Sequence, residues 1–143
     1  SKRRGQTRVS ELRDGGVRVG FGWDCVMDPW YSLGRADMLD VAFMGLHAGQ
    51  LSSREDMAWC FTAITENSAQ IIGLEDYGIA KGCFADFNLL QAKDSIEAIR
   101  LRAHRLQVVR RGKIIARNAP LSSEMDLPGR PTTIDPSSFA PKS

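Results

Sequence analysis

Residues 17–31 read VRVGFGWDCVMDPWY. The first seven residues alternate apolar side chains with arginine or glycine, which is the period-two pattern of a strand, and the glycines indicate close approach of a neighbouring backbone. Asp24 and Cys25 follow this expected strand, and Asp28 with Pro29 then predicts a turn. In an α/β barrel, residues at the carboxyl end of a strand point into the active-site face. The stretch is therefore the first place to look for chemistry.

Helical patterns flank this strand, and short strands follow them, so the sequence predicts an α/β fold. The expected helices cover residues 7–16, 35–51, 54–65, 66–74 and 94–103, and the expected later strands cover residues 84–90, 105–110 and 113–117. Ser52 with Glu55, or Ser53 with Asp56, offers a capping box for the third helix. Arg111-Gly112 predicts a hairpin.

The second expected helix, residues 35–51, carries apolar side chains around much of its circumference and is expected to be mostly buried. The chain divides into three parts on this pattern. Residues 1–76 are α/β material, residues 77–118 form a β appendage, and residues 119–143 are Pro-, Ser- and Thr-rich and are expected to be extended or disordered.

Composition narrows the class of protein. The chain has 143 residues, of which 43% are hydrophobic and 25% charged, as in a single globular domain. A net charge of +2 is too small to imply a polyanion partner, and the basic clusters at residues 2–4 and 100–111 are interpreted as solvated surface, so no nucleic acid is expected. No apolar run approaches the ~20 residues that cross a membrane, and the first residues, SKRRGQTR, lack the apolar segment expected of a secretory signal. Three widely spaced cysteines predict reduced thiols and a cytoplasmic location.

The residues at the strand exit support more than one role. Asp24 could bind a metal, accept a proton or cap the next turn. Asp28 precedes a proline and is typical of a turn residue. Trp30 could stack on a planar ligand, or it could pack against the protein.

Cys25 would need a base to act as a nucleophile, because the thiolate is the reactive form. His47 lies in an apolar helix and is expected to be a hydrogen-bonded core histidine. His104 lies in a basic segment and is expected to face water. A Cys/His pair is therefore poorly supported.

Three longer motifs of this sequence resemble those of a known protein family. GFGWDCVMDPWYSLGRADMLDVAFMGLHAGQL is similar to the last barrel strand and following helix of the cytosine deaminase branch of the amidohydrolase superfamily, with its G-x-D-x-V-x-D-P-W-Y-x-L-G pattern. TENSAQIIGLEDYGIAKGCFADFNLL and VVRRGKIIA resemble that branch's later segments. The resemblance covers residues 2–116.

The resemblance implies a (β/α)8 TIM barrel with a small β-sandwich. Residues 1–76 would be the carboxyl-terminal part of the metal-dependent barrel, and residues 77–118 the carboxyl-terminal strands of the sandwich. It also implies one divalent metal, zinc or iron, with Asp24 as a ligand that carries a proton from the metal-activated water to the departing ammonia. Trp30 would line the pocket of a small heterocyclic amine such as cytosine.

The sequence departs from the family pattern in two ways. Cys25 stands where cytosine deaminases carry a second substrate-contacting Asp, so recognition of the substrate ring should differ and a pterin or triazine amine is equally open. Trp23 stands where relatives often carry His. Cys25 and Trp30 are thus the expected substrate-binding residues, with Asp24 as the catalytic and metal-binding residue.

The chain has two histidines and no H-x-H pair, so it supplies one metal ligand and one barrel strand of eight. We expect it to be the carboxyl-terminal portion of a deaminase, inactive alone, that needs the missing amino-terminal part of the barrel. Its uncovered apolar faces predict association, and so a homo-oligomer. The alternatives are a non-catalytic, self-associating binding or scaffold module and, more remotely, a nucleic-acid-binding protein.

Overall fold

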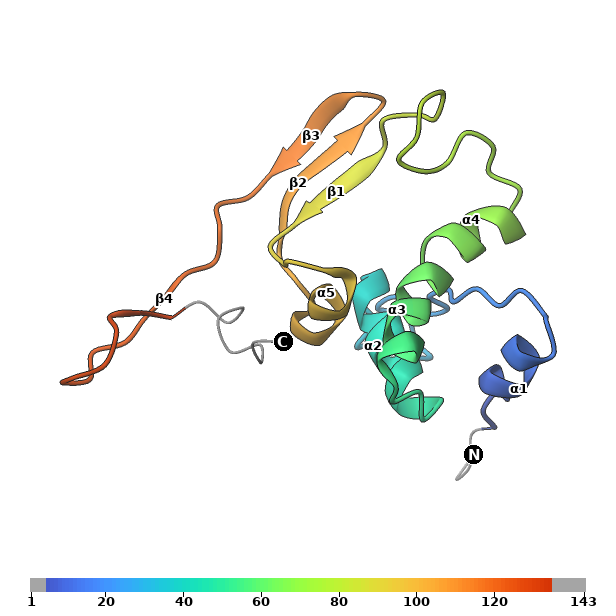
Figure 1. Ribbon diagram of the computed structural model, residues 1–143, viewed down its shortest axis with the longest axis horizontal. Helices are drawn as coiled ribbons and strands as arrows, with labels where there is room; N and C mark the ends of the chain where they lie inside the picture. The colour runs from blue at the N-terminus through green and yellow to red at the C-terminus, as the bar shows by residue number, and fades with distance from the viewer. Residues whose placement is uncertain (1–4, 135–143) are drawn as a thin grey trace.

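The structure is a computed structural model, and it describes residues 5–134. The helices are α1 (Val9–Asp14), α2 (Met38–Ala48), α3 (Arg54–Ala63), α4 (Glu66–Ile71) and α5 (Ser95–Leu101), and the strands are β1 (Phe87–Leu90), β2 (Arg105–Arg110), β3 (Lys113–Arg117), β4 (Ser123–Glu124) and β5 (Thr133–Ile134). Helices α2, α3 and α5 gather at the centre, the sheet β1–β3 rises from them, and the segment with β4 extends away (Figure 1).

The helix boundaries follow local capping chemistry. Of the two capping boxes considered, the one on α3 is Ser53 with Asp56: the Ser53 hydroxyl accepts from the Asp56 N–H at 3.0 Å, and the Asp56 carboxylate accepts from the Ser53 N–H at 3.1 Å. Helix α2 is shorter than predicted. It begins at Met38 because Asp37 caps it, and Gly49 follows its last residue.

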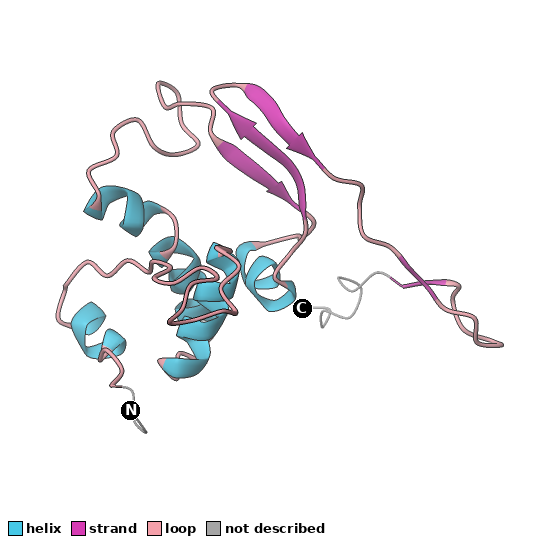
Figure 2. Cartoon of the chain, turned by 180° about the vertical axis from the view of Figure 1, so that it is seen from behind, coloured by secondary structure: helices cyan, strands magenta, loops and turns pink. Residues whose placement is uncertain are grey.

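The strand predicted over residues 17–23 is not formed in the part of the chain that the structure describes. The chain between α1 and α2 is loop throughout (Figure 2). Its backbone instead bonds to the helices: the Phe21 N–H donates to the Ala63 carbonyl at 2.9 Å, and the Val19 carbonyl accepts from the Asn67 side chain at 2.8 Å. A strand needs a neighbouring strand to exchange ladder hydrogen bonds, and no strand within residues 5–134 pairs with this segment.

The close approach predicted for the glycines of this segment is confirmed at Gly20. A Cβ atom there would lie 2.8 Å from the Ser68 hydroxyl and 3.1 Å from the Ser68 Cα. The neighbour is helix α4, not a second strand. Ser68 also donates to the Phe21 carbonyl at 3.0 Å, so the extended segment is fixed along the α3–α4 joint.

The core lies where α2, α3 and α5 meet. Its buried residues are Leu39, Ala42, Leu51, Cys60, Ala98, Ile99 and Ala103. Helix α2 is buried on one side only, because within it Leu39 and Ala42 are buried whereas Met44 is 60% exposed. The prediction of a mostly buried helix was therefore wrong.

The three-stranded sheet has the order β1-β2-β3, and both pairs are antiparallel. The predicted hairpin at Arg111 and Gly112 is confirmed: both residues have positive φ, 49° and 73°, as a tight two-residue turn requires. Helix α5 connects β1 to β2 and packs against α2 and α3. The sheet is thereby tied to the helical core.

A buried ion pair makes a second tie between the helices and the sheet. Arg105, the first residue of β2, donates to both oxygens of Asp37 at 2.7 and 2.8 Å. Asp37 is 7% exposed, and its carboxylate also accepts from the Leu39 N–H at 2.9 Å. The Arg105 guanidinium holds the pKa of the Asp37 carboxyl below its usual value, and Asp37 raises the pKa of Arg105.

The carboxyl-terminal segment is partly ordered. Strands β4 and β5 pair antiparallel within the part of residues 119–143 that the structure describes, and residues 135–143 lie outside the described residues. The Gln91 side chain exchanges two hydrogen bonds of 2.8 Å with the backbone of Leu121. Within residues 5–134, none of the helices is long and apolar enough to cross a membrane.

Replacing Arg105 by methionine should destabilise the protein by about 3 kcal/mol, because a buried carboxylate is left without its cation. Since the folded-state pKa of Asp37 is depressed, the pair's stabilisation is complete above the unfolded-state pKa near 3.8 and is lost as the pH falls through the lower folded-state pKa. The variant should show less of this acid-dependent loss, because only the Leu39 N–H and the charge of Arg35 still lower the pKa of Asp37. Denaturant unfolding at several pH values measures both effects.

Arg117→Met is the matched control, because it removes the same charge from an exposed position on β3. It should change the free energy of unfolding by no more than about 0.5 kcal/mol. Equal destabilisation by the two variants would show that Arg105 contributes only surface charge.

Candidate functional site

Asp24 lies at the exit of the extended segment that is fixed along α3 and α4. It is exposed, and it begins a loop that runs to the Asp37 cap of α2. The two ends of this loop are anchored by the bonds of Phe21 to the helices and by the Asp37 ion pair. The carboxylate is thus presented to solvent from a loop with fixed ends.

Asp28 is used by the loop itself. Its Oδ1 accepts from the N–H groups of Trp30 at 2.9 Å and Tyr31 at 3.0 Å, which is the turn predicted from Asp-Pro. The Tyr31 N–H is the main cause that lowers the pKa of the Asp28 carboxyl. Asp28 therefore stays ionised and stabilises the turn.

Cys25 is half-buried between the two carboxylates. Its hydrogen bond to Asp28 is the main cause that raises the pKa of the thiol to about 11, and burial and the charge of Asp24 add to the shift. The thiol is protonated at neutral pH, so it can donate a hydrogen bond but supplies little thiolate. This agrees with the sequence argument against a cysteine nucleophile.

Gly34 closes the loop against its own beginning. It is buried, and a Cβ atom on it would lie 2.1 Å from the Cys25 carbonyl oxygen and 2.9 Å from the Val26 Cα. The Trp23 indole N–H donates to that same Cys25 carbonyl. The sequence analysis assigned no role to Gly34. The signal for its close packing was a glycine at the end of a turn-rich loop.

Trp30 is 86% exposed, so packing against the described part of the protein does not explain it. Its loop neighbours Met27 and Leu33 are also exposed, at 79% and 74%. The loop therefore presents the rings of Trp30 and Tyr31 and further apolar side chains to solvent, in the same loop as the Asp24 carboxylate.

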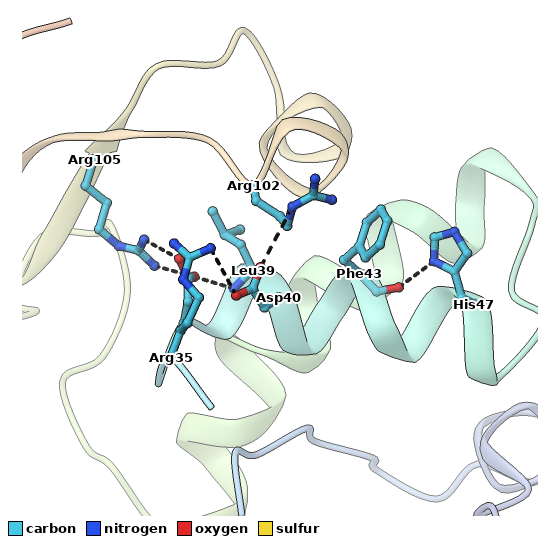
Figure 3. Close-up of polar contacts among 8 residues, drawn as sticks. Arg35, Leu39, Asp40, Phe43, His47, Arg102 and Arg105 are labelled. Carbon is cyan, nitrogen blue, oxygen red and sulfur yellow. Dashed lines mark hydrogen bonds and ion pairs between the residues drawn. The ribbon is translucent and has the colours of Figure 1, made fainter. Parts of the chain in front are cut away.

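The histidines do not join this site. His47 lies with Nδ1 2.8 Å from the Phe43 carbonyl oxygen, so the predicted hydrogen bond is confirmed, but the residue is exposed and its expected core position was wrong (Figure 3). Its own helix turn provides the partner. His104, expected to face water, is half-buried; it lies in the short connection between α5 and β2.

At the start of this loop, Asp24 is a suitable metal donor. Carboxylate oxygen is a ligand for zinc and for iron. In the described part of the chain, no three His, Cys, Asp or Glu side chains come together as a metal site would require. A complete site would thus need donors beyond these residues.

Comparison with known proteins gives a consistent family. A family model described as "Amidohydrolase family" matches residues 1–116. The chain is 31% identical over 111 residues to N-isopropylammelide isopropyl amidohydrolase of Pseudomonas sp. strain ADP, covering 77% of this chain and 28% of the relative. It is 32% identical over 124 residues to pterin deaminase of Rhizobium rhizogenes, covering 86% of this chain and 28% of the relative.

A solved structure is similar over most of the chain. The crystal structure of 5-methylcytosine deaminase from Klebsiella pneumoniae, liganded with phosphonocytosine, superposes with a TM-score of 0.79 and 37% sequence identity. The match covers 88% of this chain and 30% of that one. The chain therefore spans less than a third of the length of these relatives.

Gly34→Ala should shift the loop and lower the free energy of unfolding by about 1–3 kcal/mol, because the added methyl group meets backbone atoms that cannot move independently. Gly22→Ala is the matched control, since a Cβ there has nothing within 4 Å. Denaturant unfolding gives the stability, and tryptophan fluorescence reports the displaced Trp23 ring. Equal effects of both variants would contradict a specific closure at Gly34.

Proposed function

Because this chain belongs to the amidohydrolase family, we propose that it is the carboxyl-terminal part of a metal-dependent (β/α)8 barrel enzyme that hydrolytically deaminates a heterocyclic base. The observation that carries the proposal is the exposed Asp24 carboxylate on an anchored loop, in a chain similar to three hydrolases of heterocyclic amines. A carboxylate held in this way is available to substrate, because the loop does not use it for its own turn.

The exposed apolar side chains support a larger barrel. Trp30 and Leu33 on the loop, and Ile72 and Ile79 after α4, are 86%, 74%, 70% and 94% exposed. The segment over residues 17–23 has a strand sequence but no strand partner within residues 5–134. Neighbouring barrel strands would pair with this segment and cover these side chains, and further strands would complete the sheet β1–β3 as a sandwich.

Asp24 is the proposed metal ligand and proton carrier. A bound zinc or iron ion would supply a water of lowered pKa. The Asp24 carboxylate oxygen would accept a proton and deliver it to the leaving amine as the carbon–nitrogen bond breaks. Asp28 cannot take this role without giving up the N–H groups of Trp30 and Tyr31.

Cys25 and Trp30 are the proposed substrate-binding residues. The Trp30 ring is exposed and can stack on a planar heterocycle. The single S–H of Cys25 is donated to Asp28, so the thiol offers the substrate only a weak sulfur acceptor, whereas a carboxylate would offer a strong one. A ring that must donate hydrogen bonds at this position is therefore held less tightly, and cytosine, pterin and triazine amines are the candidate substrates.

Asp24→Ala in the full-length polypeptide should lower kcat/KM for deamination by about 10²–10⁴-fold or more, because the proton carrier is lost. The metal content should also fall. Ammonia release measures the first effect, and elemental analysis of the purified protein measures the second.

Glu55→Ala is the control for Asp24→Ala, because it removes an exposed carboxylate of α3. It should retain activity and metal. The 143-residue chain assayed alone should release no ammonia. Unchanged metal content and turnover in Asp24→Ala would overturn the proposed role of Asp24.

Cys25→Asp should raise kcat/KM for cytosine relative to that for pterin by about tenfold, since a hydrogen bond to a charged group contributes roughly 1.5–3 kcal/mol. Cys25→Ser, which keeps a neutral donor of similar size, should leave the ratio within a few-fold of wild type. The two substrates are assayed in parallel with each variant. A ratio that responds equally to Asp and Ser would remove Cys25 as a determinant of specificity.

A further inference from the structure

A hollow of about 570 Å³ lies beside the end of α5 and the α2 end of the loop over residues 24–37, and Asp24 does not line it. Its walls come from four parts of the chain: Arg35 before the α2 cap, the β1–α5 loop, α5 with the residues that follow it, and Leu121 and Ser123 of the carboxyl-terminal segment. The size falls within the roughly 300–1,000 Å³ of small-molecule sites. The proposed deaminase chemistry does not use this hollow.

Three cationic side chains from different segments line the hollow: Arg35, Lys93 and Arg102. Arg35 and Arg102 both point toward Asp40 (Figure 3), at 3.6 and 3.9 Å. These separations are longer than hydrogen bonds, so one carboxylate is shared loosely by two guanidinium groups. Arg102 also lies over the Phe43 ring, 4.4 Å from its centroid. The single Asp40 carboxylate balances one of the two guanidinium charges, so positive charge remains in excess.

The one carboxylate in the wall is occupied by the protein. Glu97 is 3% exposed; one of its oxygens accepts from the Lys93 N–H at 2.9 Å and the other from Arg100 at 3.2 Å. Its charge is thus satisfied within the structure. It leaves the cationic side of the hollow available to an external anion.

The remaining wall is apolar and held in place. Leu101 at the end of α5 and Leu121 of the carboxyl-terminal segment both line the hollow. Gln91 exchanges its two side-chain hydrogen bonds with the Leu121 backbone, and its own N–H donates to the His104 carbonyl at 2.9 Å. Hydrogen bonds therefore fix the apolar wall to the chain just before β2.

We propose that this hollow binds a small organic anion, with a phosphate or carboxylate group against the Arg35, Lys93 and Arg102 side chains that line it and its carbon framework against Leu101 and Leu121. The guanidinium groups supply paired N–H donors of the geometry that such anions prefer. A ligand with an apolar part gains the side walls in addition to the charge. The inference does not depend on the deaminase activity.

Isothermal titration calorimetry on the full-length polypeptide tests this with phenyl phosphate, benzoate and inorganic phosphate at constant ionic strength. Phenyl phosphate should bind at least about tenfold more tightly than inorganic phosphate, and benzoate should compete with it. Arg35→Gln and Arg102→Gln should each weaken phenyl phosphate about tenfold. Arg35 is the safer of the two, since its side chain is 68% exposed and its removal should not affect folding.

Arg54→Gln is the matched control, because Arg54 is an exposed arginine at the start of α3 and does not line the hollow. It should leave the affinity unchanged. Equal weakening by Arg54→Gln and Arg35→Gln would show attraction to net charge only and would overturn the site. Equal affinity for phenyl phosphate and inorganic phosphate, or displacement of phenyl phosphate by a single-stranded oligonucleotide that binds more tightly, would also overturn it.

Discussion

The ion pair between Asp37 and Arg105 is the interaction on which the rest of the structure depends. It joins residues 68 positions apart, caps the first turn of α2, and fixes the start of β2 to it. Because Asp37 is buried, removing Arg105 would leave an uncompensated charge at the junction of helices and sheet and would destabilise the fold. Helix α5 reinforces the same junction by packing its Ile99 into the core of α2 and α3.

The loop over residues 24–37 is held in place by this junction. It runs from Phe21, whose backbone is bonded to α3 and α4, to Asp37, whose carboxylate is held by Arg105. Between these anchors, the Asp28 carboxylate accepts hydrogen bonds from the loop's own backbone. Gly34 packs directly against the Cys25 carbonyl, with no room for a side chain. Asp24 is exposed at the entrance of the loop, so the carboxylate proposed for chemistry is separate from the one that maintains the turn.

The sequence predicted what depends on neighbouring residues. The Ser53 capping box, the Arg111-Gly112 hairpin and the Asp28 turn each follow from side chains within a few positions, and each is confirmed. It did not predict the Asp37–Arg105 pair or the closure at Gly34, because these depend on contacts that no local pattern specifies. The exposure of His47 was missed for a related reason: a helix with this many apolar residues was expected to be mostly buried, whereas Met44 and His47 of α2 are exposed.

The extended segment over residues 17–23 was also misjudged locally, and the physical reason bears on the proposed barrel. Its alternating side chains and glycines suit a strand, yet its ordered hydrogen bonds go to α3 and α4 on one side. Exposed apolar side chains lie at Leu33 in the loop that follows this segment and at Ile72 after α4, one of the helices to which the segment is bonded. The segment needs a backbone partner on its free side, and the nearby apolar side chains need to be covered. A further β-strand with its own helix would supply both. The proposed barrel would meet this physical requirement.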